Sequence, residues 1–211
     1  MKRTALLCAA LILASGCHNP EQARRDINKE FVKAVEQQET EAVQALIPDI
    51  DVNDPWLSPS PLAIAVDKGN AHVAIMLMNA GAKPSATYSY VARAASKNEW
   101  GLVKELLRRG HDPKRPYRDH TPLFLAARGG RLDVAKMLVE RGAQINPSSH
   151  KEYAPLAAAA SWGHLEMTKW LLEKGARTDI RNHLGMTPLR WAEHRKATAI
   201  AKLLRQYGAK S

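Results

Sequence analysis

The sequence predicts an all-α solenoid of about five helix-turn-helix repeats with short hairpin loops, preceded by a degenerate N-terminal repeat. Two observations indicate this fold. A glycine closes each predicted unit, at Gly81, Gly110, Gly142, Gly175 and Gly208, with spacings of 29, 32, 33 and 33 residues. A Ser/Thr/Ala-Pro-Leu marker opens four of the units, at residues 60, 121, 154 and 187. Self-similarity at such a period is typical of stacked units that bury a shared core.

Each predicted unit carries the signals of two helices. Thr121 and Thr187 can cap the first helix with their hydroxyls, and the proline that follows each of them suits a first helical turn. Gly69, Gly130 and Gly163 are expected to end that helix in a left-handed conformation. Apolar runs such as "VAKMLV" and "MTKWLL" then supply the buried face of a second helix.

The N-terminus reads as an export signal. Lys2 and Arg3 precede an apolar run, Ala5 to Ala14, which is far shorter than the roughly 20 residues of a membrane-spanning helix. The string "LASGC", which ends at Cys17, is similar to the lipobox of bacterial lipoproteins. That resemblance implies that Cys17 is lipidated and becomes the first mature residue; an ordinary signal peptide cut nearby is the alternative. His18, in place of aspartate, favours an outer-membrane lipoprotein that faces the periplasm.

The remaining organisation follows from these signals. Cys8 lies inside the signal, so Cys17 is the only cysteine expected in the mature chain, and no disulfide or cysteine-based metal site is expected. The predicted parts are a signal peptide (1–16), a lipidated N-terminus and linker (17–25), an N-terminal capping repeat (26–53) and the repeats (54–211). The capping repeat lacks a Thr-Pro opening, has Gln38 where glycine is usual, and has Asp26 as a plausible helix cap.

Two long segments carry a specific resemblance to a known family. "HTPLFLAARGGRLDVAKMLVERGAQIN" and "YAPLAAAASWGHLEMTKWLLEKGARTD" strongly resemble ankyrin repeats, and the likeness extends over about residues 54 to 211. The resemblance implies a protein that binds partners on a concave surface, made of hairpin tips and first helices. The spacing of 29 between Gly81 and Gly110 departs from the family and predicts a shortened hairpin finger there.

The resemblance also implies which positions contact a partner. In each unit three of these positions lie shortly before the Thr-Pro opening, and two more lie just before the mid-unit glycine. These positions are rich in aromatic and basic side chains, the types that dominate interface energies. The predicted partner-binding residues are Trp56, Leu57, Lys68, Tyr88, Lys97, Tyr117, Arg118, His120, Arg128, His150, Lys151, Tyr153, Trp162, His183, His194 and Arg195. Some of these aromatics could instead pack between fingers, and Trp100, Trp170 and Trp191 are expected to be packing residues.

The sequence argues against catalysis. "GHLE", residues 163–166, contains a histidine and a glutamate, but it is expected to be a structural turn and helix start. We expect no enzyme activity, cofactor, metal or small-molecule substrate. The net charge of +10 favours an acidic partner. Nucleic acid is not expected, because an exported protein rarely meets it.

The leading functional hypothesis is a periplasm-facing lipoprotein that binds a protein partner in its concave groove. Small ankyrin lipoproteins resemble immunity proteins that neutralise phospholipase-type effectors of type VI secretion, so such a toxic effector is one possible partner. The alternative is an envelope scaffold or accessory factor for a resident periplasmic protein.

Overall fold

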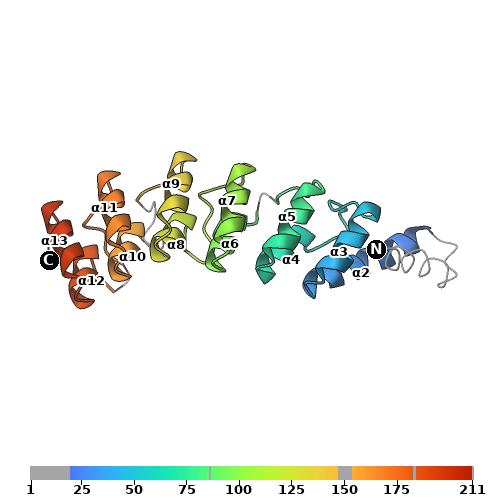
Figure 1. Cartoon of the computed structure of the whole chain (residues 1–211), viewed down its shortest axis with the longest axis horizontal. Coiled ribbons are helices and arrows are strands. Elements are labelled where there is room, and N and C mark those ends of the chain that lie inside the picture. Colours follow the sequence, from blue (N-terminus) through green and yellow to red (C-terminus); the bar gives the residue numbers. More distant parts are fainter. Residues whose placement is uncertain (1–19, 86, 147–153, 183, 211) are drawn as a thin grey trace. The chain divides into compact units, whose positions relative to one another are not determined.

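The computed structural model describes residues 20–85, 87–146, 154–182 and 184–210 (Figure 1). Within these ranges the regular elements are twelve α-helices and one 3-10 helix, without a strand, which confirms the predicted all-α fold. The chain divides into two compact units, Met1–Tyr88 and Ser89–Ser211. The division falls in the finger that the sequence predicts to be short.

The first unit contains two helix pairs. Helices α2 and α3 form the pair that corresponds to the predicted N-terminal cap, and α4 and α5 form the next pair. Helix α2 packs on α4, and α3 packs on α5. The bounds are α2 Pro20–Glu36, α3 Thr40–Leu46, η1 Ile47–Asp49, α4 Pro61–Lys68 and α5 Ala71–Asn79.

The second unit stacks four helix pairs in chain order (Figure 1). The first helices of successive pairs contact one another, α6 with α8, α8 with α10 and α10 with α12. The bounds are α6 Tyr90–Ser96, α7 Trp100–Arg108, α8 Pro122–Arg128, α9 Leu132–Glu140, α10 Pro155–Ser161, α11 Leu165–Glu173, α12 Pro188–His194 and α13 Thr198–Gln206.

The predicted start signals of the first helices are confirmed. The Thr121 hydroxyl accepts a hydrogen bond from the Phe124 amide at 3.1 Å, and the Thr187 hydroxyl accepts one from the Arg190 amide at 3.2 Å. A proline occupies the first turn in both cases. Each hydroxyl satisfies a backbone donor that the helix itself cannot, which is worth about 1 kcal/mol.

A left-handed residue precedes every second helix. The six residues are Gln38, Gly69, Asn98, Gly130, Gly163 and Lys196, with φ between 57° and 79°. The predicted glycines therefore adopt the predicted conformation. Gln38, Asn98 and Lys196 adopt it too, although a side chain makes it less favourable, so the turn is retained where the sequence marker is lost.

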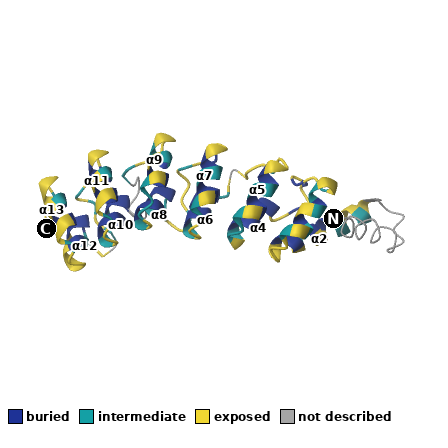
Figure 2. Cartoon of the chain, viewed as in Figure 1, coloured by how far each residue is buried: buried dark blue, intermediate teal, exposed yellow. Residues whose placement is uncertain are grey.

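The core lies between the two rows of helices of each unit. In the second unit the first helices present small side chains, and Ala94, Ala126 and Ala159 are completely buried. The second helices present leucines, such as Leu106 and Leu138, which are also inaccessible to solvent. Figure 2 shows buried and exposed stretches along the same helices. Small residues in the first row let neighbouring helices approach closely, while the large residues of the second row fill the remaining space.

Two asparagines join the end of one pair to the end of the next. The Asn53 amide donates to the Gly81 carbonyl at 3.0 Å, and its oxygen accepts from the Lys83 amide at 2.7 Å. Asn146 makes the same two bonds, to the Gly175 carbonyl and from the Arg177 amide. Both asparagines therefore satisfy backbone groups about 30 residues further along the chain.

The predicted boundary between linker and cap is wrong by six residues. Helix α2 begins at Pro20 rather than near Asp26, so residues 20–25 of the predicted linker are helical. A proline suits the first turn, where no amide hydrogen is needed, and Glu21 complements the positive end of the helix dipole. The following residues, Gln-Ala-Arg-Arg, favour helix as well.

Candidate partner-binding face

The finger before α8 brings three of the predicted residues together. Tyr117 and His120 pair as an isolated antiparallel bridge, with backbone N–H···O distances of 3.0 and 3.1 Å. Arg118 and Asp119 between them both have positive φ, 48° and 63°, as a tight primed turn requires. The turn leaves Arg118 exposed at the tip and Tyr117 and His120 half-buried below it.

Two guanidinium groups flank the Tyr117 ring. The Arg93 carbon lies 4.3 Å from the ring centroid and the Arg118 carbon 5.4 Å from it. Both distances fall within the range of cation–π attraction. Tyr117 therefore both supports the finger and presents a basic, aromatic surface.

His120 contributes a neutral ring to this surface. The ring lies 4.8 Å from that of Phe124, between centroids. Burial, and secondly the charge of Arg128, hold the pKa of His120 below its ordinary value of 6.5. At neutral pH the cations of this region are thus Arg93, Arg118 and Arg128.

An apolar hollow of about 240 Å³ lies further along the second unit. Helix α10 and the residue after it, Trp162, form one wall, the finger residues Ile180 and Leu184 form another, and Trp191 of α12 lines it as well. Trp162 is 61% exposed and Leu184 63% exposed, which is unusual for such large apolar side chains. Exposed apolar surface gathered in one place is typical of an interaction site.

Cations occupy the equivalent ends of the neighbouring first helices. Trp162 directly follows α10, and Lys97 and Arg195 directly follow α6 and α12. All three are exposed, as is His194, while Arg128 at the end of α8 is half-buried. The predicted residues of the second unit therefore combine exposed aromatic and basic groups on the same ends of stacked helices.

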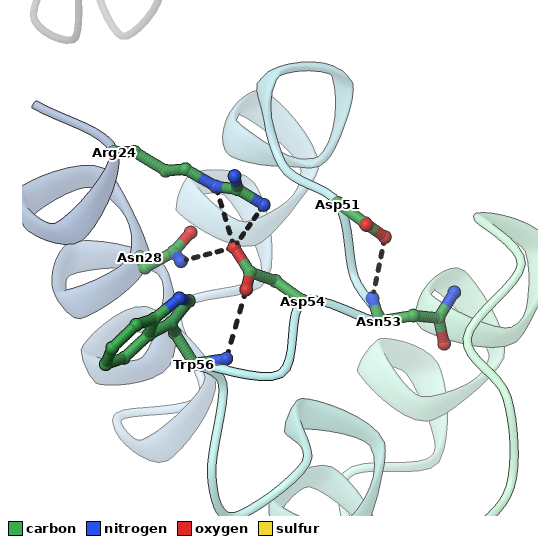
Figure 3. Close-up of polar contacts among 6 residues, drawn as sticks. All are labelled: Arg24, Asn28, Asp51, Asn53, Asp54 and Trp56. Atoms are coloured by element: carbon green, nitrogen blue, oxygen red, sulfur yellow. Dashed lines mark hydrogen bonds and ion pairs between the residues drawn. The ribbon is translucent and has the colours of Figure 1, made fainter. Parts of the chain in front are cut away.

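In the first unit a buried carboxylate, Asp54, fixes the surroundings of Trp56 (Figure 3). One oxygen of Asp54 accepts from the Arg24 guanidinium at 2.8 and 2.9 Å and from the Asn28 amide at 3.0 Å. The other accepts from the Trp56 backbone amide at 3.0 Å. The hydrogen bonds from the Trp56 amide and from Asn28 lower the pKa of Asp54 below its ordinary value, and the charge and hydrogen bond of Arg24 lower it further.

This turn separates two neighbouring predicted residues. The Trp56 side chain is 75% exposed, and the Arg25 guanidinium lies 5.9 Å from its ring centroid. Leu57 is only 6% exposed, so its prediction as a contact residue is wrong. Its amide donates to the Asp54 carbonyl at 2.9 Å, and the chain curls so that Trp56 lies outside and Leu57 inside.

The other predicted residues of the first unit differ in solvent exposure and in hydrogen bonding. Lys68 is exposed at the end of α4. Tyr88 is half-buried, and its hydroxyl donates to the Asp67 carboxylate at 2.7 Å and lies 3.3 Å from the Ala63 carbonyl. Tyr88 is therefore partly a packing residue. The predicted residues Cys17, His150, Lys151, Tyr153 and His183 lie outside the described residues.

Two residues of the hollow escaped the sequence prediction. Trp191 was expected to be a packing residue, yet it is half-exposed and lines the hollow. Leu184 lies three residues before Thr187, at one of the contact positions that the resemblance implies, but it is not among the predicted partner-binding residues. Trp100 agrees with the expectation, because it lies beside Gly129 of the next helix pair and 5.7 Å from the Arg131 guanidinium.

The "GHLE" segment has a structural role, as predicted. The His164 ring nitrogen Nε2 lies 2.9 Å from the Arg128 carbonyl, so the ring joins two helix pairs. The Thr168 hydroxyl donates to the His164 carbonyl at 2.9 Å. Among the described residues no three His, Cys, Asp or Glu side chains gather as a metal site would need. The helices of the same ranges include none that is long and apolar enough to cross a membrane.

The charge of the chain is unevenly divided. Residues 89–211 contain 23 Lys and Arg against 11 Asp and Glu, a net charge of +12, whereas residues 1–88 contain 8 against 10, a net charge of −2. The basic character of the sequence therefore belongs to the second unit. Any electrostatic attraction of an acidic partner is concentrated there.

Stacked helix pairs with exposed aromatic and basic side chains at equivalent ends define a repeat protein of the kind that binds other proteins. A family profile that describes three consecutive ankyrin repeats matches this chain twice, over residues 91–182 and over residues 149–211. The chain belongs to the ankyrin repeat family, and this family membership indicates protein–protein interaction.

Two known proteins illustrate the similarity. The crystal structure of an ankyrin repeat domain from Acinetobacter baumannii AYE matches with a TM-score of 0.66 and 25% identity, over 85% of this chain and 98% of that one. The Ankyrin repeat and KH domain-containing protein mask-1 of Caenorhabditis elegans is 35% identical over 98 residues, which is 42% of this chain and 4% of that protein. The chain thus spans only a small part of mask-1.

Proposed function

We propose that this protein is a periplasm-facing lipoprotein, anchored in the outer membrane through Cys17, that binds an acidic surface of a protein partner. The observation that supports the binding face most directly is the pair of exposed apolar side chains, Trp162 and Leu184, which line a hollow together with Arg181. The net charge of +12 in residues 89–211 gives the preference for an acidic surface.

The start of α2 sharpens the proposed anchoring. Because residues 20–25 belong to α2, at most His18 and Asn19 separate Cys17 from the described helix. Three Cα–Cα steps reach at most about 11 Å, compared with the roughly 25–30 Å that a linker ending at Arg25 would allow. A lipidated Cys17 would hold the first helix pair close to the bilayer surface.

For the partner, we propose a toxic phospholipase-type effector delivered by type VI secretion, so that the protein acts as an immunity protein. This role extends the expectation from the sequence that small ankyrin lipoproteins resemble such immunity proteins. A short tether also keeps the binder at the membrane, where such a lipase acts. The alternative is an envelope scaffold whose partner is a resident periplasmic protein.

The anchor is tested by fractionating cells that produce the full chain or its Cys17→Ser variant. We expect the parent chain in the outer-membrane fraction and labelled by radioactive palmitate. The variant should be unlabelled and should leave that fraction. Palmitate-free parent protein in the soluble periplasm would refute the lipoprotein proposal, while leaving partner binding open.

The partner is tested by immunoprecipitating the full chain from detergent-solubilised envelope. We expect one stoichiometric acidic protein, retained by the matched control Leu165→Ser and lost from the double variant Arg118→Glu, Arg128→Glu. If the protein is an immunity factor, the captured protein is a secreted lipase, and deleting the gene harms cells only when that lipase is present. A resident protein, with a deletion defect in the absence of any toxin, would establish the scaffold instead.

A further inference from the structure

The hollow beside Trp162 has the size of a single side-chain site. Its volume of about 240 Å³ exceeds the roughly 150 Å³ of an engineered apolar cavity that accepts benzene in another protein. Its walls come from α8, α10, α12 and the finger before α12, with Phe124, Ala157, Trp162, Leu184 and Trp191 among the lining residues. The hollow can therefore receive one aromatic or large aliphatic side chain.

The base of the hollow belongs to the packed first row of helices. Ala154 and Ala158, which line the hollow, are buried at 7% and 5% exposure. The Leu184 amide donates to the Asn182 side chain at 3.0 Å, and the Met186 amide donates to the same oxygen at 3.0 Å. These two hydrogen bonds hold the backbone at Leu184 and Met186, and the Leu184 side chain remains exposed. A preformed site loses little conformational freedom on binding.

The charged side chain among the described residues that line the hollow is a cation, Arg181. Arg181 donates to the Gly185 carbonyl at 3.0 Å, which orients its guanidinium. The nearby acids are engaged elsewhere in the described chain, Asp179 with Arg177 at 2.8 Å and Glu193 with Arg205 at 2.6 Å. Arg195 is exposed immediately after α12. A ligand at the hollow therefore meets the Arg181 guanidinium, while the carboxylates of Asp179 and Glu193 are paired with other arginines.

We propose that this hollow is the anchor site for the partner, and that it receives one aromatic or large aliphatic side chain from a segment whose flanking residues are acidic. The apolar walls select the anchor residue, and Arg181 and Arg195 select the flanking carboxylates. The inference rests on the proposed protein-binding function and names the chemistry of the recognised segment. An apolar side chain contributes affinity through burial, and the charges contribute specificity and association rate.

The test uses the full chain in detergent, labelled with 5-fluorotryptophan, so that the five indoles give separate fluorine resonances. The probe is the peptide acetyl-Ser-Glu-Glu-Ser-Phe-Ser-Glu-Glu-Ser-amide. Two control peptides replace Phe by Ser, or each Glu by Gln. We expect saturable shifts of the Trp162 and Trp191 resonances and none at Trp56, Trp100 or Trp170, with both controls about fivefold weaker or more, as expected when an interface anchor or its charge partner is removed.

Paired variants separate the hollow from the general surface. Leu184→Ser and Arg181→Gln should each weaken the peptide about fivefold or more, whereas Leu165→Ser, an exposed leucine on α11 outside the hollow, should not. Equal binding of the Phe-lacking peptide, shifts at Trp56, or no saturable shift at millimolar peptide would overturn the anchor site. In that case the envelope partner would still co-precipitate with Leu184→Ser, which keeps the failure of this inference distinct from failure of the proposed function.

Discussion

The guanidinium carbon of Arg93 lies 4.3 Å from the centroid of the Tyr117 ring, so a residue of α6 supports the finger that precedes α8. Tyr117 is in turn half of the bridge that closes this finger. The contact explains how a loop with two positive-φ residues is held at the edge of the binding face.

Replacing Tyr117 by leucine should loosen this finger. The variant loses the ring that both arginines approach, at a cost of about 1 kcal/mol in the free energy of unfolding. Hydrogen exchange at Arg118 to His120 should accelerate, while urea denaturation measures the loss of stability. Arg118→Gln is the control, because Arg118 is exposed and farther from the ring; an equal effect of the two variants would contradict the supporting role of Arg93.

Alanine at Gly130 should be more damaging than alanine at Gly163. Both residues have positive φ, which costs an alanine about 1 kcal/mol. At Gly130 a Cβ would also lie 2.7 Å from the His164 ring, whereas at Gly163 it meets no atom within 4 Å. We expect a total loss of about 2–3 kcal/mol for Gly130→Ala, measured by urea denaturation. Equal losses would show that His164 moves aside freely.

Removing the Asp54 carboxylate should detach the start of α2. Asp54→Ala leaves Arg24, the buried amide of Asn28 and the Trp56 backbone amide without their shared acceptor. We expect trypsin to cleave at Arg24, Arg25 and Lys29 several-fold faster than in the parent. Asp51→Ala is the matched control, because its exposed carboxylate accepts, among the described residues, only from the Asn53 backbone amide, at 3.0 Å (Figure 3). Unchanged cleavage in Asp54→Ala would refute the role of this cluster.

Acidification should destabilise the second unit through His111. Burial, and then the charge of Arg109, hold the pKa of this histidine below its ordinary value of 6.5. The ring packs edge-on against Tyr90, with centroids 5.3 Å apart. Above the ordinary value both folded and unfolded chains are neutral here. Below it the unfolded chain takes up a proton that the folded chain resists, so stability falls as the pH drops.

The measurement compares urea midpoints at about pH 7.5 and about pH 5.5. His111→Ala should reduce the acid-induced decrease in the urea midpoint. The repeat should tolerate this substitution, because alanine occupies the equivalent position after the unit-closing glycine at Ala82, Ala143, Ala176 and Ala209. His120, whose pKa is also lowered, should account for part of the remainder. An identical pH dependence in parent and His111→Ala would contradict the assignment.

The repeat fold could be predicted because its signals are local. Thr121 with its proline, and glycines such as Gly130 and Gly163, each specify a cap or a turn without reference to distant residues. The start of α2 could not be predicted from Asp26 alone, because Pro20 and Glu21 are helix-start signals that lie upstream of it.

The binding face could be predicted only in part. Counting positions back from the Pro-containing opening and from the mid-unit glycine identified Trp56 and Trp162, which are exposed, but it also assigned the buried Leu57 to the surface. The inward turn of Leu57 follows from the burial of Asp54, which depends on Arg24 and Asn28 some 26 to 30 residues earlier. Likewise, the role of Trp191 in the hollow depends on how α10 and α12 pack, and no local motif encodes that packing.

The bonds of Asn53 and Asn146 bear on how the chain can come apart. Each asparagine satisfies backbone groups that belong to the next helix pair, Gly81 and Lys83 in one case and Gly175 and Arg177 in the other. Fraying of a pair therefore strips its neighbour of two hydrogen-bond partners as well as of apolar contact. Such nearest-neighbour coupling makes melting propagate from pair to pair instead of stopping at each turn.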